Sequence, residues 1–418
     1  MTYIKSETVP NQSSDSVREI LNLGLAAAQQ KDWLSLNDYL KQLPQTKDKT
    51  KATKFVLNSQ EWQIALDLAI LMLTEAEFQH KWSIVKILPW FGDDIIPISI
   101  ALIKNPDTEA DVRWFLCQVL GNFNRPTVIL TLVELLESTT DPELATMAGK
   151  TLTKIGDDAV DVLENLITKP KHRYLAVQSL YYIRTAKTIA PLLTVTSDRD
   201  PELRALAIKA LGTFHDSRIP PFLIEALQDK ASRVRKEAAI ALGFRPDICQ
   251  DLNLVDCLRP LLYDLNLEVC RQAAVSLGRM KDETATATLF DVLQRDTTPN
   301  ELKLDLVKAI GWSQIPAAIY YLAEALNSSS TIVAAEIITI LGRTTIAELK
   351  SLAAVTLVKF WQSNNPQLKQ PQTRQALATS LGELRCDCGR ETLEQLAEDS
   401  DRKVKLHAVS ALKKIPAN

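Results

Sequence analysis

A short pattern, an aliphatic residue followed at once by glycine, recurs along this chain and constrains its architecture. Aligned on the glycine slot, eleven segments end at Gly92, Gly121, Gly156, Arg184, Gly212, Gly243, Gly278, Gly311, Gly342, Gly382 and Lys413. Nine of the twelve glycines occupy the slot. Successive slots lie 28 to 40 residues apart, which is the period of repeats built from two helices. The sequence therefore predicts an array of stacked repeats.

The residues before each glycine have the spacing of an amphipathic helix. Counting nine residues back from the slot gives position 0, which is aliphatic or methionine in nine of ten repeats, and position +8 is leucine or isoleucine in all ten. Positions 0, +4, +7 and +8 share one helix face. Each repeat is therefore expected to contain a helix A and a helix B, with a left-handed glycine cap ending helix B. Side-chain caps are expected at Asp141, Asp200 and Ser232.

We expect an all-α fold, a right-handed α-solenoid of about eleven two-helix repeats. The first eighty residues have helical spacing but lack the glycine slot, as terminal repeats often do. The predicted organisation is an irregular helical N-terminal cap region, residues 1–80, followed by the repeat solenoid, residues 81–418.

Composition narrows the class of partner and the compartment. A net charge of -3 and a pI near 6.0 argue against a general nucleic-acid binder. No apolar run has the length of a signal peptide core or a membrane span, so a cytoplasmic location is expected. Six sparse cysteines predict reduced thiols.

Position +1 of helix B is basic in six of ten repeats. A long cation at the border of the packed stripe can lay its stem on the neighbouring helix and reach an acidic turn of the next repeat, for instance at Asp200 or Asp229. This arrangement predicts a structural ladder made by Arg113, Arg204, Arg235, Lys303, Arg374 and Lys405.

Positions +2, +3, +6 and +10 lie opposite the packed stripe and are expected to face the concave groove of the solenoid. The candidate partner-binding residues there are Trp114, Tyr181, Lys209, Lys236, Phe244, Arg271, Arg279, Lys308, Trp312 and Arg343. Cations flanked by aromatic side chains fit an acidic partner protein, or the propionates and rings of a tetrapyrrole. They also fit an ordinary solvated helix face.

The sequence assigns no catalytic residue. It has no nucleophile elbow, phosphate loop or dinucleotide fingerprint. Cys386 and Cys388 form the closest thiol pair and are weak candidates for metal or cluster ligands. No metal is predicted, because two thiolates alone do not complete a tetrahedral site.

The lines 200–212 (DPELRALAIKALG) and 232–243 (SRVRKEAAIALG), with weaker copies at 267–278 and 402–412, resemble the HEAT-like repeat of the phycobilisome lyase E/F type. The resemblance covers roughly residues 80 to 414. It implies a HEAT-like solenoid from a group that includes cyanobacterial bilin lyase subunits, phycobilisome turnover factors, iron-sulfur assembly partners and plain scaffolds.

Three functional hypotheses follow. The first is a non-catalytic scaffold or assembly factor that binds another protein along the concave face and needs no cofactor. The second, implied by the resemblance, is a phycobilin lyase subunit or bilin chaperone whose partner is a phycobiliprotein; if the chain is an enzyme, this is the expected activity. The third is an iron-sulfur assembly partner that uses Cys386 and Cys388.

Overall fold

The computed structural model describes residues 14–43 and 57–415. Every regular element in these ranges is an α-helix or a short 3-10 helix, which confirms the all-α solenoid. The chain divides into two compact units, Met1–Pro191 and Leu192–Asn418. The predicted boundary at residue 80 stays a prediction, and residues 1–13 and 44–56 of the predicted cap lie outside the described residues.

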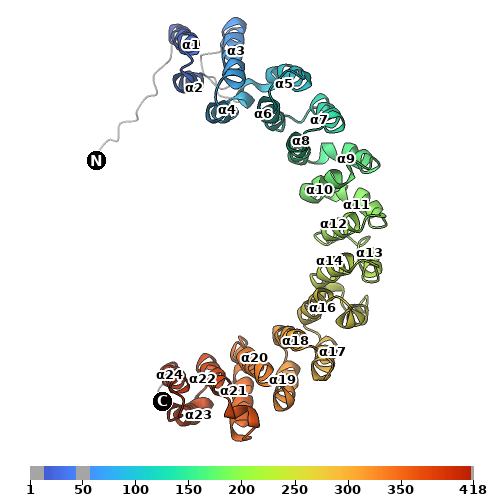
Figure 1. The fold of residues 1–418 in the computed structure, drawn as a ribbon, viewed down its shortest axis with the longest axis vertical. Helices are drawn as coiled ribbons and strands as arrows, with labels where there is room; N and C mark the ends of the chain where they lie inside the picture. Colours follow the sequence, from blue (N-terminus) through green and yellow to red (C-terminus); the bar gives the residue numbers. More distant parts are fainter. Residues whose placement is uncertain (1–13, 44–56, 416–418) are drawn as a thin grey trace, which may run out of the picture. The chain divides into compact units, whose positions relative to one another are not determined.

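Unit 1 starts with four helices that precede the regular repeats and continues with alternating A and B helices (Figure 1). In chain order its α-helices are α1 (Ser14–Gln29), α2 (Trp33–Gln42), α3 (Ser59–Glu75), α4 (Phe78–Ile84), α5 (Ile95–Lys104), α6 (Ala110–Leu120), α7 (Pro126–Ser138), α8 (Pro142–Ile155), α9 (Val160–Ile167) and α10 (Arg173–Ile183). The B helices of this unit are α6, α8 and α10.

Unit 2 has its B helices in one layer and its A helices in the other (Figure 1). The B helices are α12 (Pro201–Leu211), α14 (Ser232–Gly243), α16 (Leu267–Arg279), α18 (Asn300–Ser313), α20 (Thr331–Gly342), α22 (Pro371–Leu384) and α24 (Arg402–Leu412). The A helices are α13 (Pro220–Ala226), α15 (Leu254–Leu258), α17 (Glu283–Gln294), α19 (Pro316–Ser328), α21 (Ala347–Gln362) and α23 (Arg390–Ala397), while α11 (Ile189–Val195) crosses the unit boundary. None of the described helices has the length and hydropathy to cross a bilayer.

The buried stripe of helix B follows the predicted phase in unit 2 but not in two helices of unit 1. In α14, Val234 at position 0 and Leu242 at position +8 are buried, as predicted. In α8 the stripe starts three residues earlier than predicted, at Leu144, and continues through Ala148 and Leu152. The same three-residue shift in α10 places His172 at position 0. The buried residues Ala176, Val177 and Leu180 then stand at positions +4, +5 and +8.

The predicted left-handed glycine caps are wrong for most slots. Among the slots only Gly92, Gly156 and Arg184 have positive φ, 63°, 83° and 54°, whereas Gly121 and Gly212 have helical backbone and Gly243, Gly278, Gly311, Gly342 and Gly382 lie inside their helices. With the phase corrected, five B helices have a residue with positive φ at position +12, three residues beyond position +9. These residues are Gly156, Arg184, Lys281, Gln314 and Arg385.

The glycines are needed because successive B helices approach closely at position +9. A Cβ on Gly278 would lie 2.5 Å from the carbonyl oxygen of Ala309, and a Cβ on Gly382 would lie 2.6 Å from the Cβ of Ala411. In unit 2 each +9 glycine meets position +7 of the next B helix, and the pairs are Gly212 with Ala241, Gly243 with Ser276, Gly278 with Ala309, Gly311 with Ile340, Gly342 with Ser380, and Gly382 with Ala411.

Serine and threonine hydroxyl groups also form hydrogen bonds between successive B helices. The side chain of Thr151 donates to the carbonyl of Cys117 (3.1 Å), that of Ser179 to Gly149 (3.3 Å), and that of Ser276 to Ala239 (2.7 Å). In the corrected phase, all three bonds join position +7 to position +5 of the preceding B helix. The small residues therefore mark a repeated backbone contact.

The predicted caps are correct at two of three positions. Asp141 and Asp200 accept hydrogen bonds from the first turns of α8 and α12, and each is followed by proline, which lacks an N–H that would need a partner there. Ser232 is wrong as a cap because it is the first residue of α14, after the N-cap residue Ala231.

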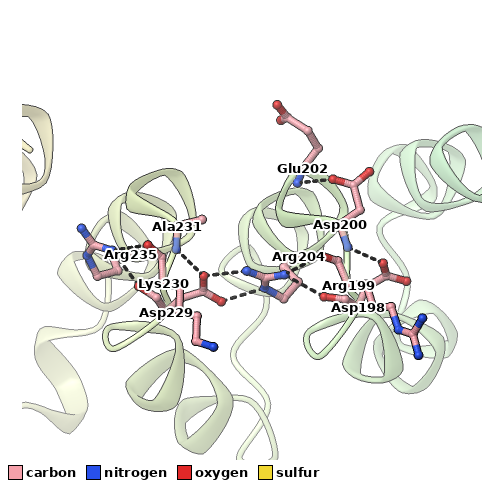
Figure 2. A network of polar contacts seen from close by, with 9 residues as sticks. All are labelled: Asp198, Arg199, Asp200, Glu202, Arg204, Asp229, Lys230, Ala231 and Arg235. Atoms are coloured by element: carbon pink, nitrogen blue, oxygen red, sulfur yellow. Dashed lines mark hydrogen bonds and ion pairs between the residues drawn. The ribbon is translucent and has the colours of Figure 1, made fainter.

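Of the six residues predicted to form the ladder, Arg204, Arg235 and Arg374 pair with a carboxylate of the next repeat, and Asp229 is a partner as predicted. Figure 2 shows the Arg204 guanidinium donating to both carboxylate oxygens of Asp229 (2.7 Å each) and to the carbonyl of Asp198 (2.7 Å). Asp200 is not part of this contact because its carboxylate caps α12.

The ladder continues through the same turn. Arg235 donates to the carbonyl of Asp229 (2.7 Å) and to both carboxylate oxygens of Asp264 (2.6 and 2.8 Å). Arg374 makes the same fork to Asp399 (2.6 and 3.0 Å). Arg113 departs from the pattern and donates to a backbone carbonyl, that of Ile103.

A Cβ at position +9 is predicted to separate two repeats. Gly278→Ala places a methyl against backbone of the next helix, which no side-chain rotation relieves, so we expect a loss of about 1–3 kcal/mol in the free energy of unfolding. Urea denaturation measures it. Gly24→Ala is the matched control because its Cβ would lie at ordinary contact distance, 3.4 Å from Leu68, and alanine favours the helix by about 0.5–1 kcal/mol. Equal effects would contradict the close-approach explanation.

Arg235→Lys is predicted to lower the free energy of unfolding by about 1–3 kcal/mol at neutral pH, because one ammonium cannot replace the fork. Burial raises the pKa of Asp264, but hydrogen bonds from Arg235 and from the N–H of Asn266 outweigh it and bring the pKa below its ordinary value. The stability that the Arg235–Asp264 ion pair contributes is therefore present above the unfolded-state pKa of aspartate, roughly 3.9. It is lost as pH falls through the pKa of Asp264 in the folded protein.

Urea denaturation of the wild type and of Arg235→Lys at neutral and acidic pH tests this prediction. The difference in free energy of unfolding between the two proteins should be smaller at acidic pH. Arg259→Lys is the control, because its pair with Asp256 is exposed and such pairs contribute about 0.2–1 kcal/mol at most. A loss that is independent of pH would contradict the role of Asp264.

Candidate functional site

The ten predicted groove residues all lie on B helices or at their C-terminal ends. None is buried: Lys209, Phe244, Arg279, Trp312 and Arg343 are exposed, and Trp114, Tyr181, Lys236, Arg271 and Lys308 are half-buried. Trp114 and Tyr181 belong to unit 1 and the other eight to unit 2. In unit 2 these eight share the B-helix layer. We call the accessible side of that layer, at positions −1, +2, +3, +6 and +10, the B face.

Ion pairs within the B face neutralise part of its positive charge. Arg271 contacts Asp305 of the next B helix (2.9 Å) and Glu268 one turn earlier (2.6 Å). Lys308 lies 3.6 Å from the other oxygen of Asp305. These contacts span two repeats and could not be read from the sequence. The charge available to a partner is therefore concentrated on other residues.

A row of side chains at position +10 runs across the repeats of unit 2. Its four consecutive members, which we call the +10 row, are Phe244, Arg279, Trp312 and Arg343. The Arg279 guanidinium carbon lies 4.5 Å from the centroid of the Phe244 ring. Phe244 is 56% exposed and Trp312 49%. The row thus alternates aromatic and cationic groups in reach of solvent.

Two further pairs show that successive +10 residues are neighbours. Lys154 donates to Asn122 in unit 1 (2.9 Å), and Lys414 pairs with Glu383 at the end of unit 2 (2.5 Å). Both pairs join position +10 of one B helix to position +10 of the next. Together with the contact of Arg279 and Phe244, three pairs of successive +10 residues are therefore neighbours in space.

An aromatic cluster lies on α4 and α6 of unit 1. Trp82, 42% exposed, stacks on Trp114 with ring centroids 6.4 Å apart, and the buried Phe115 contacts both. Phe78, 59% exposed, completes the cluster at 5.2 Å from Phe115. Helical phase predicted Trp114 as a partner-binding residue, and it did not reach α4, which precedes the first glycine slot.

A buried lysine lies beside this cluster. Lys81 is 3% exposed and pairs with Glu109 and Asp111, at 2.8 Å each. Burial by itself lowers the pKa of Lys81, but the two carboxylates outweigh it and raise the pKa above its usual value. Lys81 therefore stays charged and links α4 to the start of α6.

Cys386 and Cys388 have their sulfur atoms 2.7 Å apart. Burial and the neighbouring Cys386 thiol raise the pKa of Cys388 to about 12, so this sulfur is protonated at neutral pH. Within residues 14–43 and 57–415, no three His, Cys, Asp or Glu side chains gather as a metal site. The iron-sulfur hypothesis gains no support from this geometry.

Open clefts lie beside the arginine ladder. One of about 570 Å³ is lined by Phe222 and Glu225 of α13 together with Arg204 and Asp229. A second, of about 530 Å³, is lined by Trp361 of α21 and Arg374 of α22. Both arginines are already held by bidentate ion pairs with Asp229 and Asp399.

Comparison with known proteins agrees with a fold of two-helix repeats. A model of HEAT repeats matches residues 96–181, 189–252 and 220–303. Protein YibA of Escherichia coli strain K12 is 26% identical over 171 residues, which are 39% of this chain and 59% of YibA. Human AP-1 complex subunit beta-1 is 27% identical over 182 residues, 40% of this chain but only 19% of that protein.

Solved structures with similar folds include importin beta, with a TM-score of 0.51, 12% identity, and coverage of 96% of this chain and 64% of importin beta. Kap121p has a TM-score of 0.50 and 16% identity, with coverage of 97% and 54%. At these identities the likeness concerns the fold alone. The repeat match and the all-helical architecture agree on one fold: an α-solenoid whose residues 96–181 and 189–303 are similar to HEAT repeats.

Proposed function

We propose that this chain is a non-catalytic scaffold that binds a partner protein along the B face of unit 2. The observation that carries the proposal is the exposure of large apolar side chains among cations on that face. Ile332, at position −1 of α20, is 64% exposed, and Phe244 and Trp312 are about half exposed. Accessible apolar groups of this size, bordered by polar ones, are typical of protein-binding surfaces.

The charge of the face favours a partner with acidic residues. Lys236, Arg279 and Arg343 make no ion pair within the part of the chain that the structure describes. Cations of this kind increase association rates with acidic surfaces. AP-1 complex subunit beta-1 is by its name a component of a protein complex, which agrees with a scaffold function.

Site-directed photo-crosslinking tests the scaffold proposal. We expect a photo-reactive phenylalanine at Ile332 or Gln272, both on the B face, to capture one and the same protein in extract of the source cells. The matched control replaces Tyr320, which is equally accessible at 61% but lies on α19 in the A layer. Capture from the A layer alone, or from neither layer, would contradict the proposal.

The resemblance to phycobilisome lyase repeats supplies a second candidate, a bilin lyase subunit or bilin chaperone. The contact of Arg279 with the Phe244 ring favours it, because a tetrapyrrole offers propionates to cations and rings to aromatic groups. This role needs only groups that hold the pigment against an acceptor cysteine of a phycobiliprotein.

A visible absorption spectrum tests the bilin candidate. Mixing the purified protein with a free bilin should shift and sharpen the pigment's band, and Arg279→Gln should weaken the shift because it removes the cation. Arg295→Gln is the control, since Arg295 stacks on Tyr263 at 5.0 Å but belongs to the A layer. An unchanged pigment spectrum would eliminate this candidate and leave the scaffold proposal intact.

A further inference from the structure

The +10 row has a spacing that selects one backbone conformation in a bound chain. Neighbouring packed helices have axes roughly 8–10 Å apart, so the row presents one side chain at about that interval. A polyproline II helix repeats every three residues with a rise of about 3.1 Å each, or about 9.3 Å per turn. Every third side chain of such a segment therefore meets one repeat.

The side chains of the row specify what a bound segment should carry. Phe244 and Trp312 offer exposed rings, and aromatic surfaces are the usual docking sites for polyproline II segments. Arg279 and Arg343 alternate with them, and neither forms an ion pair in the described part of the chain. An arginine fork binds carboxylate in bidentate geometry.

We propose that the +10 row binds a proline-rich acidic segment of a partner protein in the polyproline II conformation. The segment places an apolar residue, an acidic residue, an apolar residue and an acidic residue at every third position, opposite Phe244, Arg279, Trp312 and Arg343 in turn. The proposal rests on the scaffold function and specifies the chemistry of its partner. The crosslinking positions Ile332 and Gln272 lie outside the row, so crosslinking tests the scaffold function independently of the peptide-binding proposal.

The ends of the row agree with a site of four repeats. Beyond Arg343 the next +10 residue, Glu383, is paired with Lys414, so it offers neither a ring nor an available cation. On the other side the preceding +10 residue is Thr213, which is short and half-buried. A bound segment therefore spans four repeats, which correspond to about ten residues of polyproline II chain.

Fluorescence anisotropy with a labelled synthetic peptide, Leu-Pro-Pro-Glu-Pro-Pro-Leu-Pro-Pro-Glu, tests the proposal on the full chain. We expect saturable binding that weakens at high salt, since the acidic contacts are screened. The variant Arg279→Gln with Arg343→Gln should weaken it at least about tenfold, as loss of charged hydrogen bonds does. Arg295→Gln, in the A layer, should change it less than about twofold. Trp312→Ala should also weaken it without altering its salt dependence.

Two control peptides test the register. Exchange of both glutamates for glutamine should weaken binding to the wild type as strongly as the double arginine variant does, and the two losses should not add, because they remove the same contacts. The peptide Leu-Pro-Glu-Pro-Leu-Pro-Glu, whose side chains repeat every two residues, should bind about tenfold more weakly.

The proposal is overturned by absent peptide binding, by equal binding to the double arginine variant, or by equal binding of the shortened peptide. Tighter binding of a single-stranded oligothymidine to the same residues would also overturn it in favour of nucleic acid. In each of these cases continued crosslinking from Ile332 would leave the scaffold function standing.

Discussion

Close contact between successive B helices, centred on positions +5, +7 and +9, is the constraint on which the rest of the structure depends. Glycine at +9 lets the backbones approach, and the residue at +7 of the next helix, which is alanine or serine in every unit 2 pair except that of Ile340, fills the remaining space. At three +7 positions, Thr151, Ser179 and Ser276, the side-chain hydroxyl also donates to a carbonyl of the preceding helix. A solenoid is stabilised by nearest-neighbour interfaces, and this contact supplies the regular one.

The arginine ladder adds ion pairs between successive repeats to that helix contact. Asp229 illustrates how, because its carboxylate accepts Arg204 while its backbone carbonyl accepts Arg235. One turn thereby connects the helix before it with the helix after it. Both partners of each rung are more than four-fifths buried, so the ion pair is shielded from solvent and its geometry is fixed by three or more hydrogen bonds.

The repeat period, the all-α class and the B-helix phase of unit 2 could be predicted from sequence because the recurring glycine and the aliphatic spacing before it determine them. The error at Gly156 and Arg184 has a physical origin. Glycine serves two purposes in this fold, close approach at +9 and left-handed backbone at +12, and a sequence does not show which purpose a given glycine serves. Arg184, Gln314 and Arg385 show that the left-handed position does not even require glycine.

The accessible side chains of the candidate site could be predicted from sequence, but their contacts with one another could not. Helical phase nominated the ten accessible side chains, but the pairing of Arg271 with Asp305 depends on two side chains that are 34 residues apart and meet across a repeat. The same holds for the stack of Trp82 on Trp114. Such contacts depend on how one helix is rotated against the next, which periodicity does not specify.

The ladder is interrupted in the middle of unit 2, where position +1 is Cys270, Lys303 and Ala334 in turn. Cys270 keeps one bond of the missing arginine, to the carbonyl of Asp264 (3.1 Å), but forms no fork to the following repeat. This stretch therefore relies on helix packing where its neighbours have ionic cross-links. A partner bound across these repeats would act as the missing brace, and by thermodynamic linkage its affinity and the cohesion of the repeats would rise together.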